Sequence, residues 1–154
     1  MTLHEHLANL AQTGDLAAHE AGAAELQQHL DNARDLLADA RNESVSMLGR
    51  FNAAYGASHA LLTAAIKLRG YRPTGTRGHR QTLFALAGQL LPGAAAAQPV
   101  LADANNKRNK AEYDGATIQV TGALLQSLIA AAASLDEEVR HAFKTHVKKK
   151  DPEA

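Results

Sequence analysis

The fold is decided by residues 45–69, which read VSMLGRFNAAYGASHALLTAAIKLR. Apolar or small side chains recur every three or four residues along this stretch, at Leu48, Phe51, Tyr55, Ser58, Leu62 and Ala65. Such spacing places them on one face of an α-helix, so the stretch predicts a long helix with one buried stripe. Gly70 is a natural C-terminal glycine, and Pro73 prevents the helix from continuing nearby.

The same periodicity predicts helices on both sides of this stretch. The expected helices are residues 2–11, residues 16–42 (with apolar Leu26, Leu30, Ala33, Leu37 and Ala40), residues 81–91, residues 100–113 and residues 117–146. A loop is expected over residues 71–78, with a proline and two glycines. The predicted organisation is a short helix and turn (1–15), one helical bundle (16–148) and a flexible tail (149–154).

Composition supports this fold class and excludes several others. The 154 residues are 45% apolar but only 4% aromatic, and alanine and leucine recur throughout, so we expect an all-α antiparallel bundle of five to six helices. The absence of cysteine excludes disulfides and thiol chemistry. Sixteen basic residues balance sixteen acidic ones, so any nucleic-acid partner needs a local basic patch. No signal peptide or long apolar run is present, so no membrane partner and a cytoplasmic location are expected.

One polar block stands out in this chain. Residues 104–115 read ANNKRNKAEYDG and are expected to lie on the helix of residues 100–113. The Arg108 guanidinium suits phosphate, and the Tyr113 phenol can donate to a phosphate oxygen or stack on a base. The alternative is a solvated face with an Arg108–Glu112 ion pair, worth about 0.3–0.5 kcal/mol. The spacing alone favours the ion pair.

Further candidates lie outside the block. Asn52 and His59 share a helical face beside Tyr55. Either this face looks toward Arg108 and completes a polar pocket, or Tyr55 packs in the core while His59 caps a carbonyl or points to water. Arginines gather around the loop and can contact phosphates, or can simply be solvated; they are Arg69, Arg72, Arg77 and Arg80. His79 is a reserve candidate for a base. The histidine spacings fit no metal site, and neither a metal nor a cofactor is expected.

Three features together resemble the HEPN-domain family, small helical bundles of bacterial and archaeal toxin–antitoxin and defence systems. They are RFNAAY (50–55) leading to His59; GYRP (70–73) followed by GHR (78–80); and RNKAEYD (108–114). The similarity covers residues 26–143. It implies a HEPN-like bundle that forms a homodimer, with the site in a cleft between the two copies.

The resemblance also suggests chemistry. Catalytic family members cut RNA without a metal, through an Arg, often followed by Asn, and a His a few residues later. This chain keeps Arg108 and Asn109, but position 113 is Tyr, as in a family branch with Arg-x-x-Ala-Asp-Tyr. A phenol titrates near pH 10 and is a poor general base at neutrality. Arg108, Asn109 and Tyr113 are therefore the candidate catalytic residues of an endoribonuclease whose usual His is replaced.

Two functions remain open. The first is binding of RNA or a nucleotide around Arg108, with Asn105, Asn52, His59, Arg72, Arg77 and Arg80 as further binding residues, and metal-independent cleavage as an extension. The second is a catalytically degenerate module, which dimerises or binds an antitoxin or nucleotidyltransferase partner without doing chemistry itself.

Overall fold

A computed structural model describes residues 1–75 and 78–150 of the chain, and these residues form an all-α fold, as composition and periodicity predicted. The elements in chain order are α1 (Leu3–Gln12), β1 (Leu16–Ala18), α2 (Ala23–Arg41), α3 (Met47–Leu68), β2 (Tyr71–Pro73), α4 (His79–Leu90), the 3-10 turn η1 (Pro92–Ala94), α5 (Ala97–Tyr113) and α6 (Gly122–Lys150).

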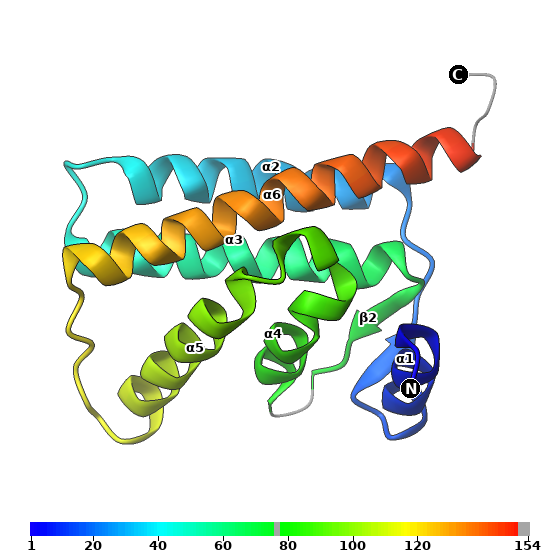
Figure 1. The fold of residues 1–154 in the computed structure, drawn as a ribbon, viewed down its shortest axis with the longest axis horizontal. Helices are drawn as coiled ribbons and strands as arrows, with labels where there is room; N and C mark the ends of the chain where they lie inside the picture. Colours follow the sequence, from blue (N-terminus) through cyan, green and yellow to red (C-terminus); the bar gives the residue numbers. More distant parts are fainter. Residues whose placement is uncertain (76–77, 151–154) are drawn as a thin grey trace.

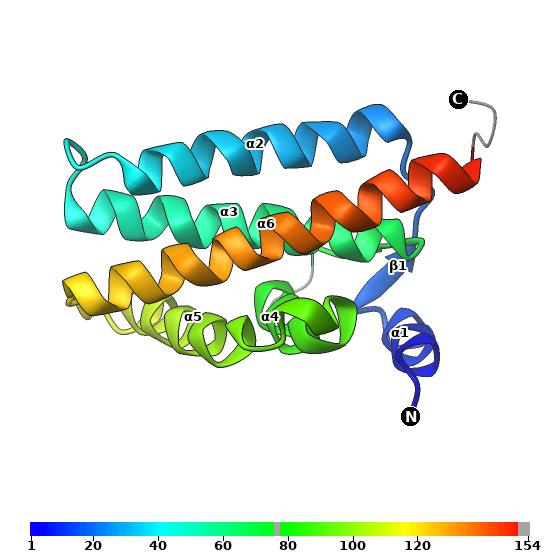
Figure 2. The ribbon, with the colours of Figure 1, turned by 45° about the horizontal axis from the view of Figure 1, so that its top comes forward.

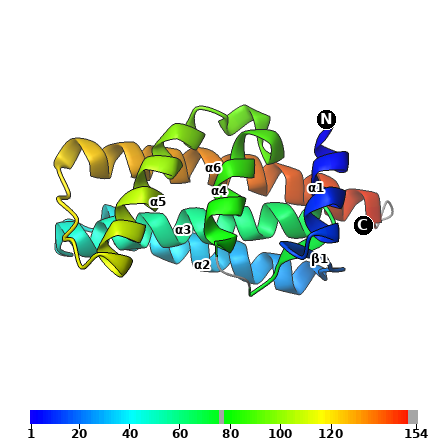
Figure 3. The same ribbon diagram turned by 90° about the horizontal axis from the view of Figure 1, so that it is seen from below.

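Three long helices form the body of the molecule. Figures 1 and 2 show α2, α3 and α6 side by side, with α2 antiparallel to α3 and α6 running in the same direction as α3. The shorter helices α4 and α5 pack on the other side of this group, and α1 lies beyond α4 near the end of α3 (Figure 3). Helix α3 therefore lies between α2 on one side and α4 and α5 on the other.

The hydrophobic core follows the predicted stripes. On α2 all five expected positions are buried, and on α3 Phe51, Tyr55, Leu62 and Ala65 are buried. Leu48 was predicted to share this stripe, but it is 48% exposed. It lies in the first turn of α3, beyond the point where the neighbouring helices cover that face. Each large apolar side chain that is fully buried contributes about 1.5–3 kcal/mol.

Residues 16–18 were predicted as helix, and that prediction was wrong. They form β1, which pairs antiparallel with β2, with Leu16 opposite Pro73 and Ala18 opposite Tyr71. Gly70, with φ 89°, reverses the chain after α3 and brings β2 against β1. The backbone hydrogen bonds of residues 16–18 therefore go to a distant segment, so α2 begins only after Gly22. The predicted loop of residues 71–78 likewise begins as a strand.

The last helix starts later than predicted. Residues 117–121 are not helical, and α6 begins at Gly122, after Thr121 accepts a hydrogen bond from the Leu124 N–H at 3.1 Å. The segment TIQVT is mostly β-branched, which weakens its helix propensity, and a Thr hydroxyl is a favoured N-cap. No helix within residues 1–75 and 78–150 combines the length and hydropathy that a bilayer span needs.

We predict that two leucines of α3 differ sharply in their effect on stability. Leu62→Ala should lower the free energy of unfolding by about 2–5 kcal/mol, because the side chain is fully buried and its removal leaves a cavity. The matched control Leu48→Ala, on the same helix but half exposed, should cost about 0.5 kcal/mol or less. Chemical denaturation measures both values; similar losses for the two variants would contradict the placement of α3.

Candidate functional site

Tyr55 lies at the centre of the polar region between α3, α4 and α5. Its side chain is buried, and its hydroxyl donates a 2.9 Å hydrogen bond to Oδ1 of Asn105 on α5. The edge of Phe84 on α4 meets the Tyr55 ring at a centroid distance of 5.2 Å. Burial raises the pKa of Tyr55, so this phenol is a neutral donor at physiological pH. One side chain thus joins three helices.

Arg108 lies over one side of this ring. Its guanidinium carbon is 5.0 Å from the Tyr55 centroid, within cation–π distance. Nη1 donates to Oδ1 of Asn52 at 2.7 Å, and Nη2 donates to Oε1 of Glu112 at 3.2 Å. The side chain of Arg108 is only 25% exposed. The structure therefore turns this guanidinium inward and brings Asn52 to it, the first of the two alternatives for this face of α3.

Arg80, in the first turn of α4, approaches the same ring. Its guanidinium carbon is 6.0 Å from the Tyr55 centroid, and Nη1 is 3.7 Å from Oε1 of Glu112. One carboxylate is therefore shared by two guanidinium groups. Arg80, Arg108 and Glu112 together carry one uncompensated positive charge, held against an aromatic face.

A cavity of about 380 Å³ opens beside this cluster. It lies between the first turn of α4 and the C-terminal half of α5, two helices that Figure 3 shows next to each other. Its lining comes from Gly75, Gly78, His79, Arg80, Gln81, Asn105, Asn109, Glu112 and Tyr113. Such a lining offers amide, guanidinium, imidazole and phenol groups, which suits a polar ligand that accepts hydrogen bonds.

A second recess of about 220 Å³ lies on the other side of Glu112. It is lined by Leu48, Asn52, Arg108, Ala111, Glu112, Ala116 and Ile118. Arg108 therefore faces this recess and not the larger cavity, and Glu112 forms a wall of both. The lining of the second recess is mainly apolar.

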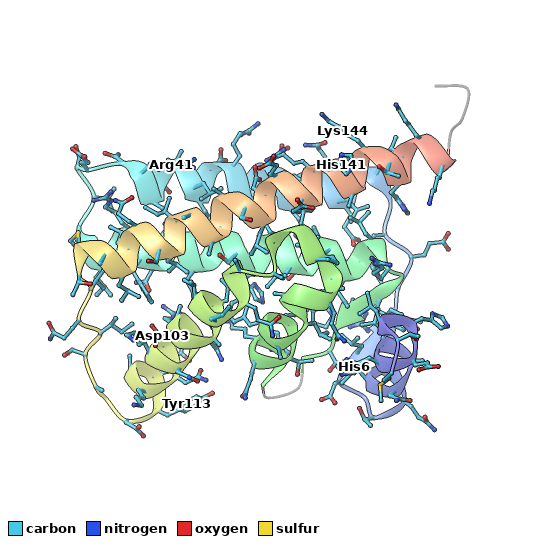
Figure 4. All side chains as sticks on the ribbon, viewed as in Figure 1. His6, Arg41, Asp103, Tyr113, His141 and Lys144 are labelled. Carbon is cyan, nitrogen blue, oxygen red and sulfur yellow. The ribbon has the colours of Figure 1, made fainter. Side chains whose placement is uncertain are left out.

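The candidate residues predicted from sequence fall into groups. Asn105, Asn109, Tyr113 and Arg80 line the larger cavity, and Arg108 and Asn52 line the smaller recess. Tyr113 is at the rim, 64% exposed, and Figure 4 shows it at the lower end of α5.

Arg72 is on β2 and exposed, and it lines neither space. Arg77 lies outside the described residues.

His59 lies behind the cavity. Its ring meets the ring of His79 edge to face, with centroids 5.7 Å apart, and only His79 of the two lines the cavity. Burial, and then the positive charge of Arg80, lower the pKa of His59 to about 4. His59 is therefore a neutral imidazole at physiological pH, and it supports His79 instead of reaching the cavity as a binding residue.

Sequence reasoning missed two components of the site. Glu112 was considered only as the partner of Arg108 within one helix, whereas it also approaches Arg80 on α4. Gln81, at the start of α4, was not a candidate but lines the cavity. The GHR segment of residues 78–80 was the available signal, because a glycine before a helix marks an open N-terminus.

No group of three or more His, Asp or Glu side chains within the described ranges is placed to hold a metal ion. Comparison with protein-family models, with curated proteins and with solved structures found no match for this chain. The likeness to HEPN domains therefore stays a prediction that rests on the residues quoted above.

We predict that His59 makes stability depend on pH. Its pKa in the folded protein, about 4, is below the usual value of 6.5, so the unfolded chain takes up the proton first as the pH falls. The contribution of this histidine is complete above pH 6.5 and is lost progressively toward pH 4. Between pH 7 and pH 5 the loss should be about 2 kcal/mol.

His59→Gln should flatten that part of the stability profile, measured by urea denaturation at pH 7 and pH 5. His29 also has a lowered pKa, from burial and then from Lys67 at 2.9 Å, so it contributes in the same direction and stays in place in this comparison. His4→Gln, at an exposed position on α1, is the control. An unchanged profile in His59→Gln would show that His59 is not buried as described.

Proposed function

We propose that this protein binds RNA or a nucleotide through its phosphate in the cavity between α4 and α5. The observation that carries the proposal is the arrangement around Tyr55: two guanidinium groups share one carboxylate beside a cavity lined by amides and imidazole. Phosphate oxygens accept hydrogen bonds and carry negative charge, so they complement this lining.

The way in which Arg108 is held supports a binding role. Asn52, Glu112 and the Tyr55 ring fix its guanidinium, so little side-chain entropy is lost when an anion enters nearby. A solvated surface pair would have no partner on another helix. Lys107, on the same helix, makes such a pair, with Asp103 at 2.8 Å. Arg108 instead carries its charge into the interior next to the cavity.

The resemblance to HEPN domains extends the proposal to a bacterial toxin–antitoxin or defence protein that acts as a homodimer with the site at the dimer interface. The smaller recess favours contact with a second copy here, because Leu48 and Ile118 give it an apolar lining next to Arg108. The homodimer itself, a cytoplasmic location and the cellular role are parts of the proposal.

Cleavage of RNA without a metal is the catalytic extension. Tyr113 stands where the family motif has His, and the imidazole that lines the cavity comes from His79 on α4 instead. A neutral imidazole can accept a proton near neutral pH, and Arg80 is placed to stabilise negative charge on a phosphate. We assign the proton transfer to His79 and leave Tyr113 as a hydrogen-bond donor or stacking surface at the rim.

The second candidate function is a non-enzymatic module that dimerises or binds an antitoxin or nucleotidyltransferase partner. One observation favours it. Both Nη atoms of Arg108 already donate hydrogen bonds within the chain, so this guanidinium has a structural role. In that case the cavity binds its ligand without catalysing a reaction, or the smaller recess contacts the partner protein.

We predict that Arg108→Lys weakens binding of a fluorescently labelled single-stranded RNA by about tenfold, equivalent to about 1.4 kcal/mol. Lysine keeps the charge but loses the planar fork that bonds Asn52 and Glu112 together. Asn109→Ala, which changes only a cavity-lining amide, should have a similar effect without loss of stability. Fluorescence anisotropy at fixed salt measures the affinities.

Lys107→Gln is the matched control, because Lys107 neighbours Arg108 but lines neither space. It should change the affinity by less than about threefold, the effect of one remote charge. Thermal unfolding of each variant checks that the fold is kept. A loss of affinity in Lys107→Gln without a loss in Arg108→Lys, which keeps its charge, would show that binding is a general charge effect and not a property of this site.

A cleavage assay separates the two candidate functions. If the protein cuts RNA, the activity should survive EDTA, fall about 100-fold or more in His79→Gln, and change little in Tyr113→Phe. Products are resolved on a denaturing gel, with Arg72→Gln as the control, since Arg72 lies outside the cavity. Binding without cleavage by the wild-type protein would favour the non-enzymatic module.

A further inference from the structure

We infer that the first turn of α4 is a binding site for a terminal phosphate group, at the end of a nucleotide or of an RNA strand. This inference rests on the proposed function and makes it more specific. It places the phosphate against α4, Arg80 and Asn105, and it gives Arg108 the role of a positioning residue that does not touch the ligand.

The first turn of α4 lines the cavity. Gly78 is the N-cap residue, with φ 88°, and no side chain caps this helix. The first backbone hydrogen bond of the helix runs from the Thr82 N–H to the Gly78 carbonyl, at 3.1 Å. The N–H groups of residues 79–81 therefore have no acceptor among the described residues, and three of the cavity-lining residues carry them. An anion at such a helix end is stabilised by these donors and by the helix dipole.

Asn105 provides a second and independent indication of an acceptor ligand. It is only 4% exposed, yet it lines the cavity. The Tyr55 hydroxyl donates to its Oδ1, which leaves the Nδ2 amide group to donate elsewhere. No described residue accepts a hydrogen bond from that group, and it does not belong to the fully buried unpaired atoms of the described residues, so it reaches the open space of the cavity. An oxygen atom of a bound phosphate would satisfy it.

Arg80 completes the set of donors. It occupies the second position of α4, and the 3.7 Å separation from Glu112 is longer than a hydrogen bond. The guanidinium can therefore bond a phosphate, while Glu112 stays paired with Arg108 at 3.2 Å. Pairing Glu112 in this way reduces the repulsion that its carboxylate would exert on an anion in the same cavity. This is the contribution of Arg108 to binding.

The number and direction of these donors fit a terminal phosphate better than a phosphodiester. Backbone N–H groups come from α4, an amide from Asn105 and a guanidinium from Arg80, so donors reach the cavity from two helices. A terminal phosphate has three oxygens free to accept them and carries close to two negative charges, whereas a diester has two and carries one. A volume of about 380 Å³ suits one nucleotide.

The test compares three short single-stranded RNAs of one sequence and a fixed length, which carry a 5′-phosphate, a 3′-phosphate or neither. Fluorescence anisotropy at constant ionic strength should show binding at least tenfold tighter for one or both phosphorylated RNAs. Competition with a nucleoside monophosphate and with inorganic phosphate distinguishes a mononucleotide site from one that needs the strand.

Two variants and one control complete the experiment. Asn105→Asp keeps an acceptor for the Tyr55 hydroxyl but replaces the amide donor by a carboxylate oxygen, and Arg80→Gln removes the guanidinium. Each should abolish the preference for the terminal phosphate. Arg72→Gln, an exposed arginine outside the cavity, should preserve it. Arg80→Gln decides the question by itself if Asn105→Asp fails to fold, which thermal unfolding would reveal.

The outcomes separate the inference from the proposed function. RNA that binds equally well with and without a terminal phosphate would overturn the inference, and would leave the proposed RNA binding intact. The same holds if Arg80→Gln keeps the preference. Failure of all three RNAs and of the mononucleotide to bind would overturn both.

Discussion

The polar region depends on the interaction of the Tyr55 ring with two guanidinium groups, combined with the hydrogen bond from its hydroxyl to Asn105. Tyr55 belongs to the most deeply buried helix, whereas Arg80 and Asn105 belong to two different helices that pack on it. A buried cation needs a partner, and here an aromatic face and one shared carboxylate provide it. The same contacts that dock α4 and α5 on α3 therefore also concentrate positive charge beside the cavity, so stability and the proposed binding role involve the same residues.

Much of the fold could be predicted from the sequence because it depends on local periodicity. The stripe from Leu26 to Ala40 and the run from Phe51 to Ala65 are buried as expected, since a helix fixes which residues share a face. What could not be predicted depends on contacts between distant segments. Leu16–Ala18 has a helical composition, but its backbone pairs with Tyr71–Pro73, and no local signal indicates that partner. Leu48 has the correct spacing but lies where the neighbouring helices end.

The same distinction between local periodicity and contacts of distant segments applies to the candidate site. The proximity of Asn52 to Arg108 could be proposed from the sequence as one of two alternatives, because a helix fixes which residues share a face. The sequence did not distinguish the arginines near the loop from one another. In the structure Arg80 lines the cavity, whereas Arg72 lies on a strand and does not line it. Their sequence context is similar, and only the path of the backbone decides which one faces the polar region. The ion pair between Glu112 and Arg80 of α4 could not be predicted from the sequence for the same reason.

Polar and titratable groups reach the cavity from both α4 and α5. Tyr113 of α5 lies at the rim and is 64% exposed. An imidazole enters the same cavity from α4, supported by the ring of His59 behind it. Because burial keeps His59 neutral, it adds no charge next to Arg80. The groups that the proposed chemistry requires are thus distributed over two helices, and the packing of α4 against α5 brings them into the same cavity.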